Sequence, residues 1–577
     1  MKRLHGSLGE SLRDRALLLL SGVAVAAALS TGMAYAADAP DSIYLNGKII
    51  TADKDFSIKE AVAIKDGRFV AVGSNDEVKA LSGEGTEVID LAGQTVIPGM
   101  MDTHSHLDGA GDGKLVVQLG GVKSPEEALE RIKAFVADKP AGTWIRSSGW
   151  HPPSLIGRYL TRQEIDSVAP NNPVFLSTVG HFAMANTKAL EIAGITKDTQ
   201  DPVGGKIYRD ESGEATGVLE EAAMELVDSK IPPLTPEQLV ERNIEAQHVY
   251  NSYGITSMVV TGVSEDMIRL YQDVAKSGKA TLRLAPLWRP DIRGENSVDK
   301  FKQAVETTDM VPNSGDEWVK ISGIKVSVDG GMTLRTAYTR DPYHDDPNYY
   351  GTVSVNPDVY KQAVQIAYEH GWRVMTHAVG DRAVDLVLDA YDGIKRDGPV
   401  LGGGYTITHG SLINRDQVER AKKMGVRVDG QNVFMWEKAA TVARGMGMER
   451  AQRAVPTRML IDELGFSGTA AGTDSPGTNI INPYINMYIM VTRKDPNGDV
   501  YGADQAITRE EALRLYTNAG PYFTEEQDLK GSIEVGKLAD MAVLSADFLT
   551  IPDEEIKDLT AVKTVVGGKV VYDAAAK

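Results

Sequence analysis

The chain has 577 residues, of which 42% are hydrophobic and 24% charged, so it has room for about four domain-sized units and a large buried core. Its 80 acidic residues outnumber its 61 basic residues, and the resulting net charge of -19 argues against nucleic acid as a partner. The absence of cysteine excludes disulfides, thiolate metal sites and cysteine nucleophiles, so any metal ligand must be His, Asp, Glu or a modified Lys.

Residues 1–36 have the features of a signal peptide. Basic residues precede an apolar run from Ala16 to Ala28, and Ala34-Tyr35-Ala36 has the small-x-small pattern of a cleavage site. A membrane anchor is the alternative, but the run is shorter than the ~20 residues that a spanning helix needs. We therefore expect export with cleavage after Ala36 and no membrane association of the mature chain. Because the exported chain lacks cysteine, a bacterial periplasm is the expected location.

Both ends of the remaining chain show short alternating segments that are typical of β-hairpins. The turn dipeptides Asn46-Gly47 and Asp66-Gly67 separate such segments near the N-terminus, and Gly567-Gly568 does so near the C-terminus. We expect residues 37–98 and 530–577 to build one small composite β-sandwich domain.

Strand and helix signals alternate through residues 99–529. Thr235-Pro-Glu-Gln238 and Asn356-Pro357 begin helices. Eight buried strands separated by helical segments predict an α/β fold, a TIM-like (β/α)8 barrel. A gap at about 107–233 exceeds one crossover and predicts a structured insertion after strand one, with a capping box at Ser124 to Glu127. The predicted barrel strands are Met101–His106, Ile255–Val260, Leu282–Leu287, Ile321–Val326, Arg373–His377, Tyr405–His409, Val426–Asp429 and Thr469–Thr473.

Four histidines lie at the ends of predicted strands. His104 and His106 are two residues apart on the first strand, so their side chains point to the same face at the barrel mouth. His377 ends the fifth strand and His409 the sixth, and active sites of this fold lie at the carboxyl ends of the strands. Each of these two alone would fit a hydrogen-bonded core histidine, but together the four predict metal ligands.

Asp474 and Lys325 add a carboxylate and an amine to the same region. Asp474 ends the eighth strand, which neighbours the first in a closed barrel, although an aspartate before Ser-Pro can also cap a turn. Lys325 lies inside the apolar fourth strand, where it is either a buried amine in an ion pair or a desolvated lysine with a lowered pKa. A neutral amine can add carbon dioxide, and the resulting N6-carboxylated Lys325 can bridge two metal ions.

The set His-x-His, Lys, His, His and Asp on strands one, four, five, six and eight resembles the metal-dependent amidohydrolase superfamily in its binuclear form with a carbamylated lysine. Further segments are similar to the amidohydrolase 3 branch of this superfamily, which includes N-substituted formamide deformylases. These segments are Ile97 to His106, Gly149-Trp150, Gly180-His181 with Asn186, Asp201-Pro202, Gly217 to Glu220, Asp329-Gly330, His377 to Ala383 and Gly531 to Asp540. The resemblance covers nearly the whole chain after residue 36.

The resemblance implies two divalent metal ions that share a hydroxide, which attacks the carbonyl carbon of an amide-like bond. One ion activates water and the other polarises the carbonyl group. Asp474 is the expected general base and then the acid toward the leaving nitrogen. Zinc is the expected metal, although His and carboxylate ligands also accept manganese, iron or cobalt. The expected metal ligands are His104, His106, Lys325, His377, His409 and Asp474.

Four further residues are candidates for substrate binding. Trp150 and His181 fall in the insertion, where packing is the alternative role for Trp150 and capping for His181. Asp381 and Arg382 open the helix after strand five, where a capping role competes with a substrate role.

The expected function is that of an exported hydrolase that cleaves carbon-nitrogen bonds other than peptide bonds in a small-molecule substrate. A mononuclear deaminase of a ring amine is an alternative, but relatives of that kind generally lack the bridging lysine, so Lys325 argues against it. A catalytically inactive binding or regulatory protein is a third alternative, and the six intact ligands argue against it. The sequence leaves open the identity of the substrate and whether the chain forms a homo-oligomer.

Overall fold

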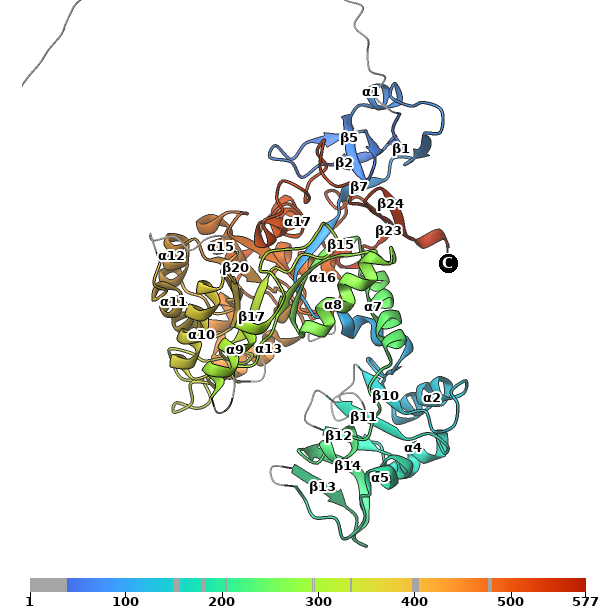
Figure 1. The fold of residues 1–577 in the computed structure, drawn as a ribbon, viewed down its shortest axis with the longest axis vertical. Coiled ribbons are helices and arrows are strands. Elements are labelled where there is room, and N and C mark those ends of the chain that lie inside the picture. The colour runs from blue at the N-terminus through green and yellow to red at the C-terminus, as the bar shows by residue number, and fades with distance from the viewer. Residues whose placement is uncertain are drawn as a thin grey trace, which may run out of the picture.

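The computed structural model describes residues 39–576 except 149–155, 157, 179–181, 203–204, 293, 295, 333–334, 397–403 and 476–479. The predicted signal peptide, residues 1–36, therefore lies outside the described residues. Figure 1 shows terminal β-sheets at one end of the molecule, a barrel in the middle and an insertion at the other end. In the described part of the chain, no helix is both long enough and apolar enough to cross a membrane.

Eight parallel strands form a nearly closed barrel in the order β8, β15, β16, β17, β18, β19, β20 and β21. At the closing point the backbone N–H of Asp474 donates to the carbonyl oxygen of His104 over 2.7 Å. The eight strands predicted from the sequence are confirmed, with small shifts at their ends. Their bounds are β8 (Met100–Ser105), β15 (Ile255–Val263), β16 (Arg283–Trp288), β17 (Gly323–Ser327), β18 (Val374–Ala378), β19 (Thr406–His409), β20 (Arg427–Gly430) and β21 (Thr469–Ala471).

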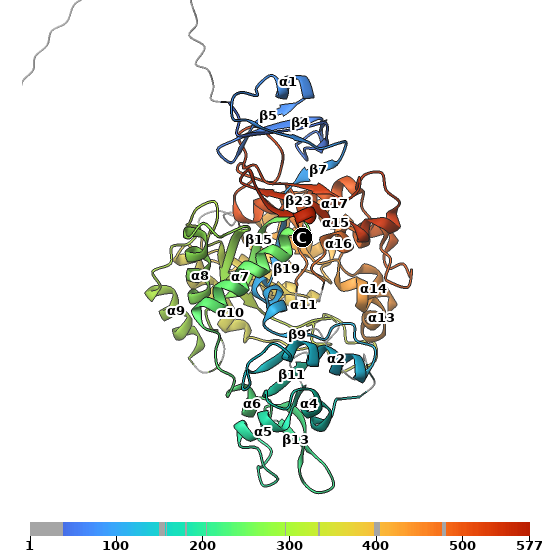
Figure 2. The ribbon, with the colours of Figure 1, turned by 90° about the vertical axis from the view of Figure 1, so that its right-hand side faces the viewer.

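Helices connect the barrel strands and surround them (Figure 2). The helix predicted at Thr235 begins with Pro236, and the side chains of Thr235 and Gln238 form a reciprocal capping box. The side chain of Asn356 likewise caps the helix that begins at Pro357. The helices are α7 (Pro236–Asn251), α8 (Glu265–Lys276), α9 (Ser297–Thr307), α10 (Pro357–Glu369), α11 (Asp381–Asp392), α12 (Arg415–Met424), α13 (Phe434–Met446), α14 (Met448–Arg453), α15 (Thr457–Leu464), α16 (Pro483–Thr492) and α17 (Arg509–Tyr516), with 3-10 turns η2 (Ala503–Gln505) and η3 (Gly520–Thr524).

The segment between β8 and α7 contains a six-stranded sheet in the order β13, β14, β12, β11, β10, β9. One hydrophobic cluster packs α2 and α4 against this sheet, and a second packs α5 and α6 against it. The elements are η1 (Leu107–Lys114), β9 (Val117–Gln118), α2 (Pro125–Val136), β10 (Ile145–Ser148), α4 (Arg162–Val168), β11 (Val174–Thr178), β12 (Phe182–Ala185), α5 (Thr187–Ala193), β13 (Gly205–Arg209), β14 (Ala215–Glu221) and α6 (Glu225–Asp228).

The capping box expected at Ser124 is only half formed. The Oγ atom of Ser124 accepts from the N–H of Glu127 over 3.1 Å, as expected. The Glu127 carboxylate, however, accepts from the N–H of Lys123 over 2.9 Å and from Arg131 over 2.7 Å. The reciprocal bond to Ser124 is therefore replaced by contacts with the preceding residue and with the next helical turn.

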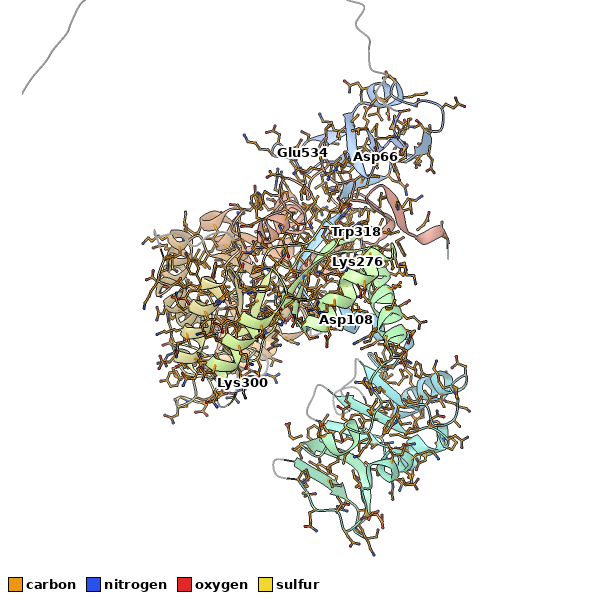
Figure 3. The ribbon with its side chains drawn as sticks, in the orientation of Figure 1. Asp66, Asp108, Lys276, Lys300, Trp318 and Glu534 are labelled. Carbon is orange, nitrogen blue, oxygen red and sulfur yellow. The ribbon has the colours of Figure 1, made fainter. Side chains whose placement is uncertain are left out.

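Polar contacts attach η1 to the helices beside the first barrel strands. The Asp108 carboxylate accepts from the hydroxyl of Tyr271 over 2.5 Å, and Asp112 pairs with Arg242 over 2.6 Å. Figure 3 places Asp108 on the side of the barrel that faces the insertion. These contacts position the chain at the point where it leaves the barrel after His106.

Two further sheets lie beside the barrel, and the larger one combines strands from both ends of the chain. A four-stranded sheet has the order β5, β4, β1, β6, and a six-stranded sheet has the order β24, β23, β22, β7, β2, β3. The two sheets share a hydrophobic cluster, and Figures 1 and 2 show the blue and red segments meeting beside the barrel. The elements are β1 (Ser42–Leu45), β2 (Lys48–Ile50), β3 (Ile58–Lys59), β4 (Ala61–Lys65), β5 (Arg68–Gly73), α1 (Asn75–Lys79), β6 (Glu87–Asp90), β7 (Thr95–Pro98), β22 (Met541–Leu544), η4 (Asp553–Asp558), β23 (Ala561–Val566), β24 (Lys569–Asp573) and η5 (Ala574–Ala576).

The three turn dipeptides behave differently. Asp66-Gly67 joins the antiparallel pair β4 and β5, and Gly567-Gly568 joins β23 and β24, as expected for hairpins. Asn46-Gly47 does not form a hairpin, because β1 pairs with β4 and β6 on its two sides and has no free edge for β2. This turn instead passes the chain from one sheet to the other.

Candidate active site

Three of the predicted ligands meet where the barrel closes. The Nε2 atoms of His104 and His106 each lie 3.3 Å from Oδ1 of Asp474. One ligand atom from each of the three residues lies within 4.8 Å of the others. His104 is buried, whereas the side chain of His106 is 46% exposed. Asp474 has a positive φ of 53°, a strained conformation for a residue with a side chain.

The other two histidines lie against this group. The ring centroids of His104 and His409 are 4.7 Å apart, and those of His377 and His409 are 4.4 Å apart. His409 ends β19 with a positive φ of 75° and is 2% exposed. Two residues of one cluster thus adopt left-handed backbone at the ends of barrel strands, which is typical of functional sites.

Lys325 completes the group from β17. Its side chain is buried, and its Nζ atom lies 3.5 Å from Nδ1 of His104. Burial lowers the pKa of the Lys325 amine to about 8, against the opposing effect of Asp429 and Asp474. The structure therefore brings all six predicted ligand residues together, and burial makes the Lys325 amine easier to deprotonate than that of an exposed lysine. That they bind metal stays a prediction.

Two residues on β20 and just after it belong to this site, and the sequence reasoning did not identify them. The Oε1 atom of Gln431 lies 2.6 Å from Nδ1 of His409, and its Nε2 atom donates to Oδ2 of Asp429 over 3.3 Å. The same Asp429 oxygen lies 3.7 Å from Nδ1 of His104, and its other oxygen is buried without a hydrogen bond. Asp429 could have been predicted, because it ends the predicted seventh strand, as the predicted ligands end theirs.

Two buried carboxylates hold the backbone beside the predicted ligands. Asp102 accepts from the N–H of His104 over 3.0 Å and from the Thr473 hydroxyl over 2.6 Å, which ties β8 to β21. Asp329 accepts from the N–H groups of Val379 and Gly380, at the start of α11. Burial raises the pKa of both carboxyl groups to about 7, despite these hydrogen bonds.

The histidines of the cluster differ in their protonation preferences. Burial lowers the pKa of His377 to about 3 and that of His409 well below its ordinary value, so both imidazoles are neutral. Burial opposes ionisation of Asp474, but His104 and His106 outweigh it and hold the pKa of this carboxyl well below its usual range. Neutral imidazoles and an ionised carboxylate are donors that divalent transition metals prefer. The pKa of His104 is raised instead, because Asp474 and Asp429 outweigh burial and Lys325, so a bound cation would take the place of its proton.

The predicted substrate-binding residues are not brought to this cluster by any contact of the described residues. Trp150 and His181 lie outside the described residues. Asp381 is the first residue of α11 and accepts from the N–H of Arg340 over 2.7 Å and from the Asn414 amide over 3.2 Å. The exposed Arg382 guanidinium lies 4.9 Å from the ring centroid of Tyr338. These contacts hold loops together, and a substrate role for all four residues stays a prediction.

Comparison with known proteins identifies the family to which this chain belongs. Residues 87–572 match the Amidohydrolase family, and the chain belongs to this family. The protein LONG AFTER FAR-RED 3 of Arabidopsis thaliana is 31% identical over 547 residues, which cover 92% of this chain and 91% of that protein. An N-substituted formamide deformylase of Arthrobacter pascens is 29% identical over 546 residues, covering 92% and 98%. The resemblance inferred from the sequence is thereby confirmed.

A solved structure shows the same fold. The crystal structure of an uncharacterized metal-dependent hydrolase from Pyrococcus furiosus superposes with a TM-score of 0.71 and is 28% identical to this chain. The match covers 88% of this chain and all of that one. The names of these three relatives differ, so membership of the family does not by itself identify a substrate.

Proposed function

We propose that this chain is a metal-dependent hydrolase that cleaves amide-like carbon-nitrogen bonds other than peptide bonds. The observation that carries the proposal is the cluster of His104, His106 and Asp474 at the closing point of the barrel, together with Lys325, His377 and His409. A related protein named N-substituted formamide deformylase, similar over 92% of this chain, supports this reaction class.

The residues of the cluster fit two divalent ions, with zinc as the expected metal. His104 and His106 would hold one ion and His377 and His409 the other, with N6-carboxylated Lys325 between them and Asp474 on the first. Bound ions supply Lewis acidity, which polarises a carbonyl group and lowers the pKa of water. The low pKa of the buried Lys325 amine supports carboxylation, because the neutral amine is the form that adds carbon dioxide.

Asp474 is the proposed proton carrier. Its Oδ1 atom lies 3.3 Å from the Nε2 atoms of His104 and His106, so the carboxylate is held beside two of the proposed metal ligands. There it accepts a proton from the attacking water and returns it to the leaving nitrogen. The hydrolysis forms a carbon-oxygen bond, breaks the carbon-nitrogen bond and releases a carboxylic acid and an amine.

A screen of the purified, metal-loaded protein tests the proposal. The panel holds N-formyl and N-acyl amines, amino-acid amides, cyclic imides and lactones, with a ring amine such as adenine as the probe for deamination. Release of an amine from an N-formyl or N-acyl substrate supports the proposal. Release of ammonia from the ring amine alone would favour the mononuclear deaminase, and binding without turnover would favour an inactive regulatory protein.

We also propose export to the periplasm with cleavage after Ala36, on the basis of the basic, apolar and small-x-small pattern in residues 1–36. N-terminal sequencing of protein from a periplasmic extract should start at Ala37. Protein that begins at Met1 and stays in the cytoplasmic fraction would refute this proposal.

A further inference from the structure

Asp429, on β20, is a buried carboxylate that the proposed reaction does not use. Its side chain is 0% exposed, and its Oδ1 atom has no hydrogen-bond partner among the described residues. Its Oδ2 atom lies 3.3 Å from Nε2 of Gln431 and 3.7 Å from Nδ1 of His104. Burial of a carboxylate is costly unless polar donors surround it, so these two groups are the donors that stabilise Asp429 in the interior.

The two donors lead to different parts of the candidate metal centre. The Gln431 amide donates to Asp429 through Nε2, and its Oε1 atom lies 2.6 Å from Nδ1 of His409. A carboxylate only accepts, so Asp429 orients the amide with its nitrogen inward and leaves the oxygen for the Nδ1–H group of His409. His104, Asp429, Gln431 and His409 therefore form one chain of polar contacts, in which Asp429 accepts from both sides.

The two nitrogens of His104 face different groups. Its Nε2 atom lies 3.3 Å from Oδ1 of Asp474, on the side of the predicted ligands. Its Nδ1 atom faces Asp429, with Nζ of Lys325 at 3.5 Å. A proton on Nδ1 stabilises Asp429 and leaves the lone pair of Nε2 for an ion, whereas a neutral ring protonated on Nε2 would deprive Asp429 of this donor.

We propose that Asp429 is a positioning residue that fixes the metal-binding nitrogen of His104 directly and that of His409 through Gln431. This inference rests on the proposed metal-dependent function. In that function His104 belongs to the first ion, which it holds with His106, and His409 belongs to the second. A single carboxylate on β20, which carries no predicted ligand, thus prepares both positions.

The competing role for Asp429 is that of a counter-ion for Lys325. Its charge opposes the effect of burial on the pKa of the Lys325 amine. The contacts of Asp429 in the described part of the chain are, however, with Gln431 and His104. A counter-ion alone would not involve Gln431, so a connection between Asp429 and His409 through this amide distinguishes the two roles.

Stepwise zinc affinities test the proposal. Chelator competition on stripped protein gives an affinity for each ion, and His106→Asn and His377→Asn assign the two affinities to their positions. Asparagine has the size of aspartate but keeps one acceptor oxygen and presents an amide N–H group in place of the other. We expect Asp429→Asn to weaken the first ion by roughly 10- to 100-fold and the second by a smaller factor, because Asp429 reaches His409 only through Gln431.

A double variant separates this chain of contacts from general loosening of the barrel. Gln431→Met removes the connection between Asp429 and His409. In this background Asp429→Asn should weaken the first ion as before and have no further effect on the second. A merely structural role would weaken both ions alike, and the losses from the two substitutions would add. Such additive losses, or native affinities in Asp429→Asn, would overturn the proposal.

Asp495→Asn is the matched control. Asp495 is also buried, and it accepts from the N–H groups of Asn497 and Asp499 in the turn after α16. Removal of its charge should leave both zinc affinities unchanged. Melting temperatures of the stripped proteins check that each variant is folded.

The results also distinguish this inference from the proposed function. If Asp429→Asn shows the expected losses but the native protein cleaves no carbon-nitrogen bond, the positioning role stands and the proposed function fails. If the native protein is active and Asp429→Asn keeps the native zinc affinities, the inference fails and the function stands. A native protein that binds no divalent ion would overturn both.

Discussion

Gln431 fixes the orientation of His409. Its Oε1 atom lies 2.6 Å from Nδ1 of the imidazole, and both side chains are buried. An amide oxygen can only accept, so Nδ1 carries the proton and Nε2 presents its lone pair to the cluster. Gln431, the residue after β20, thereby determines which nitrogen of His409 is free to bind metal.

Gln431→Met tests this relationship. The substitution removes the acceptor and leaves the Nδ1–H group of His409 buried without a partner. We expect the affinity for zinc to fall by roughly 10- to 100-fold, the usual effect of losing such a supporting contact. A chelator competition assay measures the affinity directly.

Gln365→Met is the matched control, because Gln365 is a half-buried residue of α10 that forms hydrogen bonds with the Glu369 carboxylate and the Lys395 backbone, away from the cluster. Its metal affinity should equal that of the native protein. Native affinity in Gln431→Met as well would show that His409 is held by other contacts or does not bind metal.

Asp474→Asn tests the proton carrier. Asparagine keeps the shape of the side chain but cannot accept the proton, so kcat should fall by at least ~100-fold, the scale of general-base catalysis. Metal content must be measured on the same sample. Near-native turnover with metal bound would assign the base to another residue.

Lys325→Ala tests the bridging role. An unmodified ammonium group would repel two divalent ions, whereas a carbamate supplies a negative charge between them. We expect this variant to lose metal and activity together, and acetate or propionate in the buffer to restore part of both by filling the gap. Crystals of active native protein should show density for a carboxyl group beyond Nζ. A bare amine that contacts no metal in such crystals would contradict the binuclear centre.

Glu164 gives a prediction that does not depend on metal. Hydrogen bonds from Arg158 and from Thr161, the residue that caps α4, lower the pKa of this carboxyl from its ordinary 4.5 to about 2, although burial opposes them. Between pH 4.5 and pH 2 the Glu164 carboxyl binds a proton in the unfolded chain but not in the folded chain. The stabilisation of the folded state by Glu164 is therefore present above pH 4.5 and is lost as the pH falls toward 2. Glu164→Ala should destabilise the insertion by about 1 kcal/mol at pH 7.

Thermal unfolding from pH 7 to pH 3 checks this prediction, and the difference from the native protein should shrink at the acid end. Glu211→Ala is the control, because Glu211 is exposed in the turn between β13 and β14. It should shift the melting temperature little at any pH. A pH-independent effect of Glu164→Ala would show that the charge of Glu164 does not stabilise the cap.

The barrel was predictable because its signals are local. Each strand is a short apolar run between helix starts such as Thr235 and Asn356, and eight such runs leave few alternatives to a closed barrel. The Asn46-Gly47 turn shows where local reasoning fails. The dipeptide specifies a turn, but the strands that compete to pair with β1 come from residues 61–65 and 87–90, whose positions depend on the tertiary fold.

Some residues of the candidate site could be predicted from the sequence and others could not. His104, His377 and His409 could be predicted, because the carboxyl ends of barrel strands meet at one edge. Gln431 could not, because His409 lies on another strand and nothing in the sequence spacing indicates a hydrogen bond between them.

Metal content measured together with activity tests the central claim most directly. The native protein is purified, assayed by elemental analysis, stripped with a chelator and reloaded with zinc in increments while turnover of its best substrate is followed. The six-residue centre predicts close to two divalent ions per chain, no activity in the stripped protein and recovery in step with reloading. A stripped protein that retains full activity would contradict the account.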